Sequence, residues 1–197
     1  MKNCTFVKSV FSSEEYILDN KPNIVFIGRS NVGKSSLINA IFDNKTLSKT
    51  SSKQGLTKSI NYFNVDNSFY FVDLPGYGFS KASKKSEDVW ENLIEGYLLN
   101  SEKKLIIMLV DIRIKPTEQD KQMLSFLNFY HLDYFIVATK CDKLSKAQQN
   151  NAKLEIAREL NVGVDNVMFC SSVNKTNIEN LKEKIEKWVF DNDEILS

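Results

Sequence analysis

The residues with the clearest chemistry in this sequence run from Gly28 to Ser35, read GRSNVGKS and have the spacing G-x-x-x-x-G-K-S. Glycines at both ends of such a loop let successive backbone N–H groups turn towards one anion. The lysine can reach the terminal phosphates of a nucleotide, and the hydroxyl after it is suited to bind Mg²⁺. We predict a phosphate-binding loop made of Gly28, Arg29, Ser30, Asn31, Val32, Gly33, Lys34 and Ser35.

The residues that flank this loop favour phosphate binding over a purely structural turn. A short apolar run, residues 23–27, precedes the loop, and Leu37, Ile38 and Ile41 follow it at helical spacing. A strand, a glycine-containing loop and a helix form the context in which the motif works.

A second candidate element, Asp73-Leu74-Pro75-Gly76, follows another apolar run. A carboxylate at the end of a strand can hold Mg²⁺ through the water shell of the ion, and the Gly76 N–H can face a γ-phosphate. Alone, D-x-P-G more often marks a turn, but its position after a phosphate-binding loop favours the metal-site interpretation.

The best candidate for a second hydroxyl ligand of the metal ion is Thr57, which follows Gly55 in the stretch between these two elements. We expect it to reach Mg²⁺ only when a γ-phosphate orders its loop, and the alternative is a solvated threonine. The predicted Mg²⁺ ligands are then Ser35, Thr57 and Asp73, and the predicted catalytic residues are Lys34, Thr57 and Gly76. The predicted nucleotide contacts of this loop are Gly55, Leu56, Thr57, Lys58 and Ser59.

The element Thr139-Lys140-Cys141-Asp142 predicts which base is bound. The Asp142 carboxylate can accept two hydrogen bonds from guanine N1–H and N2–H₂, and adenine offers no such pair, so we expect GTP rather than ATP. The Lys140 stem could lie across the base plane. The alternative is a polar loop with an ordinary lysine. Further on, Ser171 and Ser172 could contact the guanine O6 through backbone N–H groups. Cys170 is also predicted as a nucleotide contact, although its side chain is expected in the core.

The elements that position these residues alternate between strands and helices, which predicts an α/β fold. Strands are expected at 23–27, 61–65, 69–72, 105–110, 134–138 and 167–170, with 61–72 as an antiparallel hairpin. We predict a three-layer, doubly wound P-loop domain with a mostly parallel six-stranded sheet and helices on both faces. The polar clusters at Gly28, Asp73, Thr139 and Ser171 all follow predicted strands, so they should converge at one edge of the sheet. The predicted division is a leader, 1–22, extended on the domain or partly disordered, one domain, 23–191, and a tail, 192–197.

The bulk composition excludes several other classes of function. The chain has 197 residues, 42% of them hydrophobic, and a net charge of +1, so no global field draws it to nucleic acid or membrane. Three cysteines without a C-x-x-C pair argue against a disulfide framework or a zinc site. The sequence has no signal peptide, no apolar run of about 18 residues and no prenylation cysteine. We therefore expect a cytoplasmic monomer that binds neither DNA nor membrane.

The individual residues within and around these motifs resemble those of the EngB family of bacterial GTPases. The similar segments are GRSNVGKSSLIN from Gly28, VDLPGYGFSKAS from Val72, VDIRIKPTEQDKQML from Val110, TKCDKLS from Thr139 and FVKS from Phe6. The resemblance implies hydrolysis of GTP to GDP and phosphate with Mg²⁺, and a role as a nucleotide switch in assembly of the large ribosomal subunit. It also implies a link to cell division and septum formation. The alternative is a GTP-dependent module that recruits cell-division proteins, with incidental hydrolysis.

The resemblance also bears on the rate of hydrolysis and on a second cation. Tyr77 occupies the position in which Ras-like enzymes carry a catalytic glutamine, so we expect slow intrinsic hydrolysis, at or below the ~10⁻⁴ s⁻¹ of unassisted Ras. Asn31 resembles the potassium-coordinating asparagine of related GTPases, which makes K⁺ activation a hypothesis. A nucleotide-dependent basic face for ribosomal RNA, or an ordinary solvated surface, is predicted for Lys45, Lys49, Lys53, Lys58, Lys81, Lys84 and Lys85.

Overall fold

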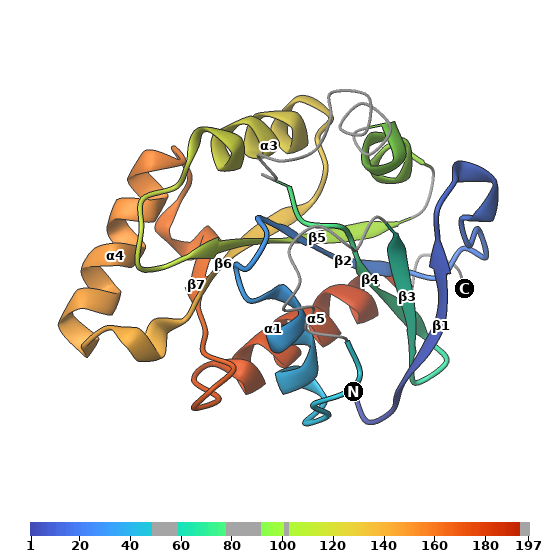
Figure 1. The fold of residues 1–197 in the computed structure, drawn as a ribbon, viewed down its shortest axis with the longest axis horizontal. Helices are drawn as coiled ribbons and strands as arrows, with labels where there is room; N and C mark the ends of the chain where they lie inside the picture. Colours follow the sequence, from blue (N-terminus) through green and yellow to red (C-terminus); the bar gives the residue numbers. More distant parts are fainter. Residues whose placement is uncertain (49–58, 78–91, 101–102, 194–197) are drawn as a thin grey trace.

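The computed structural model describes residues 1–48, 59–77, 92–100 and 103–193, which fold around one seven-stranded sheet (Figure 1). The strand order is β1-β3-β4-β2-β5-β6-β7. The strands are β1 (Cys4–Val10), β2 (Asn23–Gly28), β3 (Ile60–Val65), β4 (Phe69–Asp73), β5 (Lys104–Asp111), β6 (Tyr134–Thr139) and β7 (Val167–Phe169). The helices are α1 (Lys34–Ile41), α3 (Glu118–Phe129), α4 (Lys146–Glu159) and α5 (Ile178–Asp193), and residues 92–98 are also helical.

The pairing of the strands confirms the predicted α/β class. Strands β4, β2, β5, β6 and β7 run parallel, whereas β3 pairs antiparallel with β4 through the predicted hairpin. The sheet has seven strands where the sequence predicted six. The additional strand, β1, lies in the segment predicted as a leader, and it pairs antiparallel with β3 at the sheet edge. Of the two alternatives for residues 1–22, the extended one describes this part.

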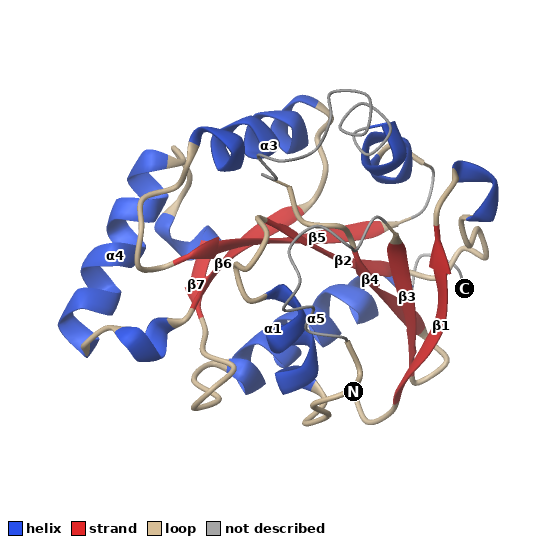
Figure 2. Ribbon diagram, viewed as in Figure 1, coloured by secondary structure: helices blue, strands red, loops and turns tan. Residues whose placement is uncertain are grey.

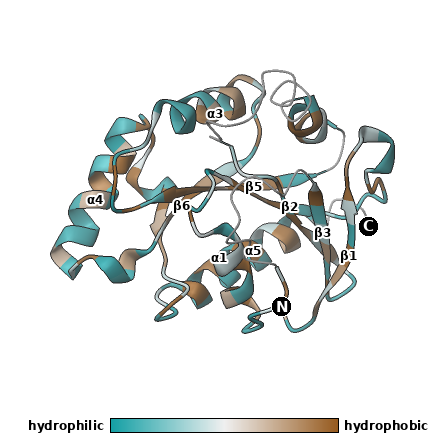
Figure 3. Ribbon diagram, viewed as in Figure 1, coloured by the Kyte–Doolittle hydropathy of each residue, from teal (hydrophilic) through white to brown (hydrophobic). Residues whose placement is uncertain are grey.

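Helices cover both faces of the sheet, so the parallel strands are buried on both sides (Figure 2). Alternate residues of β2 show this arrangement, because side chains along a strand point to opposite faces. Ile24 and Phe26 pack with α1 and α5, whereas Val25 and Ile27 pack with the side chains of α3, α4 and residues 93–98. Figure 3 accordingly colours β6 and most of β5 as hydrophobic, whereas the helices carry both hydrophobic and hydrophilic residues.

The carboxyl ends of β2, β4 and β6 carry the polar residues singled out above, and the register places them, with the end of β5, at one edge of the sheet. Gly28 lies opposite Leu109, and Asp111 lies opposite Thr139. Among the described residues, no helix is both long enough and apolar enough to cross a membrane.

Candidate nucleotide-binding site

In the loop between β2 and α1, Gly33 has a backbone conformation that favours glycine. Gly33 stands at the N-cap of α1 with a φ of 108°, a conformation that other residues rarely adopt. Having no side chain, Gly33 cannot cap the helix, and the first turn, Lys34-Ser35-Ser36, carries no acidic residue. The first N–H groups of α1 and the positive end of the helix dipole are thus left for an external anion.

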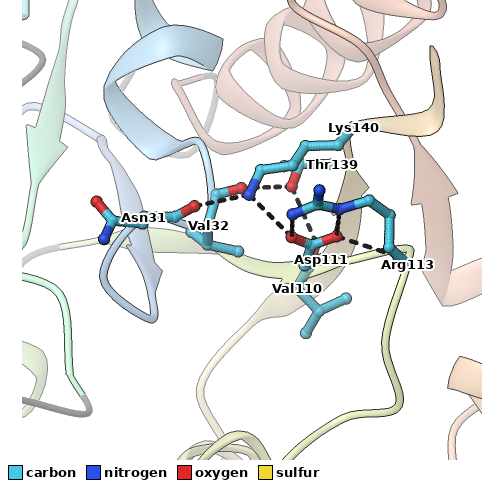
Figure 4. Close-up of polar contacts among 7 residues, drawn as sticks. All are labelled: Asn31, Val32, Val110, Asp111, Arg113, Thr139 and Lys140. Carbon is cyan, nitrogen blue, oxygen red and sulfur yellow. Dashed lines mark hydrogen bonds and ion pairs between the residues drawn. The ribbon is translucent and has the colours of Figure 1, made fainter. Parts of the chain in front are cut away.

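Thr139 and Lys140 hold this loop from the side of β6 (Figure 4). The Thr139 hydroxyl lies 2.5 Å from the carbonyl oxygen of Val32 and 3.1 Å from that of Val110. The Lys140 ammonium donates to the carbonyl oxygen of Asn31 at 2.7 Å. Two consecutive residues of the predicted base-recognition element are therefore bonded to two consecutive carbonyl groups of the phosphate-binding loop.

Asp142 is held in an ionised, oriented state by its neighbours. The Ser171 hydroxyl donates to Asp142 Oδ1 at 2.7 Å, and the Lys143 ammonium lies 3.2 Å from Oδ2. The Ser171 hydrogen bond is the main reason why the pKa of the Asp142 carboxyl lies below its usual range. Ser171 is itself fixed, because its hydroxyl oxygen accepts from the backbone N–H groups of Val173 and Asn174 at 3.1 and 3.3 Å.

A cavity of about 230 Å³ lies between these elements. Its lining joins the start of α1 to both candidate base-recognition segments: Gly33, Ser36, Leu37, Thr139, Lys140, Asp142, Lys143, Cys170, Ser172 and Val173. Cys141 and Cys170 are buried beside it, and the Cys141 N–H donates to the Cys170 carbonyl oxygen at 3.2 Å. Burial raises the pKa of the Cys170 thiol to about 12, so this thiol is an inert part of the wall.

The predicted phosphate and metal ligands are also close to one another, but they are bonded among themselves. The Lys34 ammonium forms an ion pair with Asp73 Oδ1, and the Ser48 hydroxyl donates to Asp73 Oδ2 at 3.2 Å. Asp73 is only 4% exposed. Ser48 is held in turn by Asn39 of α1, whose side chain accepts from the Ser48 N–H at 2.7 Å and donates to the Ser48 carbonyl oxygen at 2.9 Å.

The element Asp73 to Gly76 touches the phosphate-binding loop directly. A Cβ atom on Gly76 would lie 2.9 Å from the Ser30 backbone nitrogen, so only glycine allows this approach. The Ser30 N–H donates to the Tyr77 carbonyl oxygen at 3.1 Å, and Arg29 and Tyr77 form an isolated parallel bridge. Leu74 and Pro75 are buried, and the Leu74 side chain belongs to the core.

Tyr77, at the position of the missing glutamine, has a defined partner elsewhere. Its hydroxyl is buried and donates to Asp120 Oδ1 of α3 at 2.8 Å. Burial raises the pKa of the Tyr77 hydroxyl far above its usual value, and the nearby Asp120 charge acts in the same direction.

The remaining predicted site residues either lie outside the described part of the chain or have another partner. Gly55, Leu56, Thr57 and Lys58 lie outside the residues that the structure describes, so their contacts stay a prediction. Ser59 is buried, and its hydroxyl donates to the side chain of Asn61 at 3.3 Å.

Three residues of the site were missed by the sequence analysis: Ser48, Asp111 and Arg113. The Arg113 guanidinium donates two hydrogen bonds to the Asp111 carboxylate, which also accepts one from the Lys140 ammonium (Figure 4). An acid that ends a buried strand, followed two residues later by an arginine, is the signal that could have found this pair. Ser48 had no signal, because a serine in a serine-rich stretch is not distinctive.

Comparison with known proteins first gives the class of protein. A sequence model of the family described as "50S ribosome-binding GTPase" matches residues 23–140, which contain the phosphate-binding loop and most of the sheet. The chain thus carries a GTPase domain.

Individual relatives then narrow the class to one family. The probable GTP-binding protein EngB of Caldanaerobacter subterraneus subsp. tengcongensis is 42% identical over 192 residues, which cover 95% of this chain and 99% of the relative. The probable GTP-binding protein EngB of Finegoldia magna is 43% identical over 187 residues, covering 93% and 92% of the two chains. The chain belongs to the EngB family of GTP-binding proteins.

Solved structures share the fold at lower identity. A crystal structure of a probable GTP-binding protein engB superimposes with a TM-score of 0.70 at 23% identity, covering 86% of this chain and 99% of the other. The structure of Era in complex with MgGDPNP and nucleotides 1506–1542 of 16S ribosomal RNA gives a TM-score of 0.63 at 24% identity, covering 85% of this chain and 56% of that one.

Proposed function

We propose that this protein hydrolyses GTP to GDP and phosphate and acts as a nucleotide-dependent switch in assembly of the large ribosomal subunit. The observation that carries the nucleotide part is the joining of Asp142, Lys140 and the phosphate-binding loop around one cavity. The described name of the matching family, "50S ribosome-binding GTPase", supports the choice of partner. A connection with cell division and septum formation rests on the family resemblance.

The residues present fit a Mg²⁺ ion shared with the nucleotide. Asp73 supplies a buried carboxylate and Ser35 a hydroxyl at the start of α1, both typical donors for this ion. Among the described residues, no group of three or more His, Cys, Asp or Glu could hold a metal, and we expect phosphate oxygens of the nucleotide and water to contribute to the coordination. We expect Ser35 and Thr57 to bind the ion directly and Asp73 to bind it through water. The ion would neutralise charge on the phosphates.

The intrinsic rate of hydrolysis should be low, because the Tyr77 hydroxyl is bonded to Asp120 and does not replace a water-orienting glutamine. Lys34 and the loop N–H groups would stabilise the charge that develops on the phosphate oxygens. Acceleration would come from a partner or from K⁺ bound near Asn31. Equal hydrolysis rates in K⁺ and Na⁺ would remove the potassium hypothesis.

The proposed ribosome contact is a basic face that depends on the nucleotide. Of the seven lysines predicted for it, Lys45 is described and exposed, and the other six lie outside the described residues. Phosphate contacts of such lysines would make binding sensitive to salt. We expect the protein to act in the cytoplasm as a monomer.

The test is co-sedimentation with large ribosomal subunits in the presence of GDP or a non-hydrolysable GTP analogue, across a salt series. We expect binding with the GTP analogue that weakens as salt rises, and a flatter salt dependence after substitution of several of the lysines. A variant with Lys182, Lys184 and Lys187 of α5 replaced is a matched control for total charge. Binding in neither nucleotide state would favour the alternative, a GTP-dependent module that recruits cell-division proteins.

A further inference from the structure

The carboxylate of Asp111, at the end of β5, joins two cations beside the nucleotide cavity (Figure 4). Its Oδ2 accepts from the Lys140 ammonium at 2.8 Å and from Arg113 Nη2 at 2.7 Å. Its Oδ1 accepts from Arg113 Nε at 2.9 Å and from the Arg113 backbone N–H at 3.1 Å. The Asp111 side chain is 11% exposed, so both of its oxygens are occupied in a nearly buried place.

The position of Asp111 follows from the sheet and not from a chance encounter of side chains. Asp111 lies opposite Thr139 in the parallel pairing of β5 with β6. Lys140, the residue that follows Thr139 at the end of β6, has a φ of 64°. Its side chain reaches both the Asp111 carboxylate and the Asn31 carbonyl oxygen. The carboxylate and the carbonyl group thus bind the same ammonium group from two different loops.

A lysine needs such a second partner if its stem is to form one face of a binding site. A free lysine side chain loses conformational entropy when it is ordered, and this loss opposes a fixed position. The Asn31 carbonyl group supplies one acceptor for the ammonium, and the Asp111 carboxylate adds a second acceptor together with the opposite charge. The Lys140 side chain is 27% exposed, so it has room to leave the cavity if its charged partner is lost.

Arg113 keeps this carboxylate ionised and oriented. Burial of Asp111 opposes ionisation, yet hydrogen bonds from Arg113 and Lys140 hold the pKa of its carboxyl well below the usual range. The two-point contact of a guanidinium with a carboxylate also fixes the plane of the acid, which a single lysine cannot do. The Arg113 side chain is itself half exposed, and its contact with Asp111 accounts for its position.

We infer that Asp111 is a positioning residue for nucleotide binding, which fixes the Lys140 side chain between the phosphate-binding loop and the base cavity, with Arg113 as its orienting partner. This inference rests on the proposed role of Lys140 and Asp142 in guanine recognition. The competing explanation is an ion pair that only stabilises the end of β5. The two explanations differ in whether Asp111 acts through Lys140.

A double-mutant cycle on GDP affinity separates them. The four proteins are the unchanged chain, D111N, K140A and D111N/K140A, measured with a fluorescent GDP analogue. We expect D111N to weaken binding about tenfold, because the amide keeps the shape of the acid but not its charge. We expect K140A to weaken binding at least as much. In the double variant, D111N should add nothing to the loss caused by K140A.

If the loss of GDP affinity in D111N/K140A equalled the product of the losses in the two single variants, the inference would be overturned. Asp111 would then be a purely structural residue. GDP affinity unchanged in D111N would overturn it as well, and so would K140A without effect. D165N, which removes an exposed acid after α4, is the charge-matched control and should bind GDP normally. R113K should give a smaller loss than R113A, because it keeps the charge without the two-point contact.

Failure of the proposed function has a different signature in the same experiment. If the unchanged chain bound an ADP analogue as tightly as the GDP analogue, guanine recognition by Asp142 would be wrong. The cycle between Asp111 and Lys140 would still report whether the carboxylate positions the lysine.

Discussion

The two ends of the candidate site each contain a lysine and an aspartate, but only one end is already arranged to bind its part of the nucleotide. The base end contains Lys140 and Asp142, and the phosphate end contains Lys34 and Asp73. At the base end, Asp142 is oriented by Ser171, and Lys140 is fixed by Asn31 and Asp111, while the cavity between them is open. At the phosphate end, Lys34 and Asp73 neutralise each other, and Ser48 occupies the second oxygen of Asp73.

This difference indicates where binding must rearrange the protein. A guanine base meets acceptors that are already in place, so little ordering is needed for its recognition. Binding of phosphates and Mg²⁺ must instead break the ion pair between Lys34 and Asp73, because the Lys34 ammonium moves its contact from the Asp73 carboxylate to a phosphate group. The nucleotide-dependent change is therefore expected to begin at Lys34, Asp73 and Ser48.

The largest expected effect comes from removing the cation at the phosphate end. K34A should reduce GTP hydrolysis by about 100- to 1000-fold, because one preorganised stabiliser of the phosphate charge is lost. It should also lower the free energy of unfolding by about 3–5 kcal/mol, because the buried Asp73 is left without its cation. K34A/D73N should recover much of this stability in thermal unfolding but none of the hydrolysis. If K34A/D73N recovered no stability, the unpaired Asp73 carboxylate would not be what destabilises K34A.

A second prediction tests the readiness of the base end. D142N should lower GTP affinity at least about 100-fold, because the amide cannot accept both guanine hydrogen bonds. The same variant should gain affinity for XTP, since the new N–H group can donate to the xanthine O2. Competition of GTP and XTP against a fluorescent nucleotide measures both changes. A loss of GTP affinity without any gain for XTP would indicate a disrupted loop rather than a change in specificity.

A third prediction concerns the pH dependence of Asp142. Its pKa is lowered in the folded protein, so the carboxylate stabilises the fold above the unfolded pKa of about 3.9, and this is lost as pH falls through the folded pKa. S171A removes the main cause, so the pKa of Asp142 should rise towards its ordinary value and GDP affinity should fall about three- to tenfold. Carboxyl NMR titration measures the pKa. S172A, which changes only a cavity-lining serine, should leave it unchanged.

Much of the fold and of the site could be predicted, because the signals are local. The phosphate-binding loop, Asp73-Leu74-Pro75-Gly76 and Thr139-Lys140-Cys141-Asp142 all follow buried apolar strands, so sequence order alone predicts their convergence. Strand β1 was not predicted, because its Phe6 and Val7 are exposed and its partner, β3, lies some 50 residues away.

The missed contacts depend on distances along the chain that no local pattern encodes. The bond between Asp111 and Lys140 spans 29 positions and follows from the register of two strands. The contact of Ser48 with Asp73 spans 25 positions and depends on how Asn39 holds the chain after α1. Such side-chain partners are set by tertiary packing, which the order of residue types does not reveal.

The smallest expected effect tests the residue that joins the phosphate end to α3. Y77F keeps the backbone contacts of this residue with Gly28 and Ser30 but removes the donor to Asp120. We expect the free energy of unfolding to fall by about 1–2 kcal/mol, because a buried acceptor loses its partner. The rate of GTP hydrolysis should stay within about twofold, equivalent to ~0.4 kcal/mol in the barrier, because the hydroxyl faces α3.

Single-turnover hydrolysis and thermal unfolding of Y77F measure the two effects separately. T117A is the matched control, since Thr117 bonds the other oxygen of Asp120 and should change stability alone. A much slower rate in Y77F with unchanged nucleotide affinity would contradict the expectation. It would mean that the Tyr77 hydroxyl leaves Asp120 when the phosphate end rearranges, so that the exchange of partners at Lys34 and Asp73 extends as far as α3.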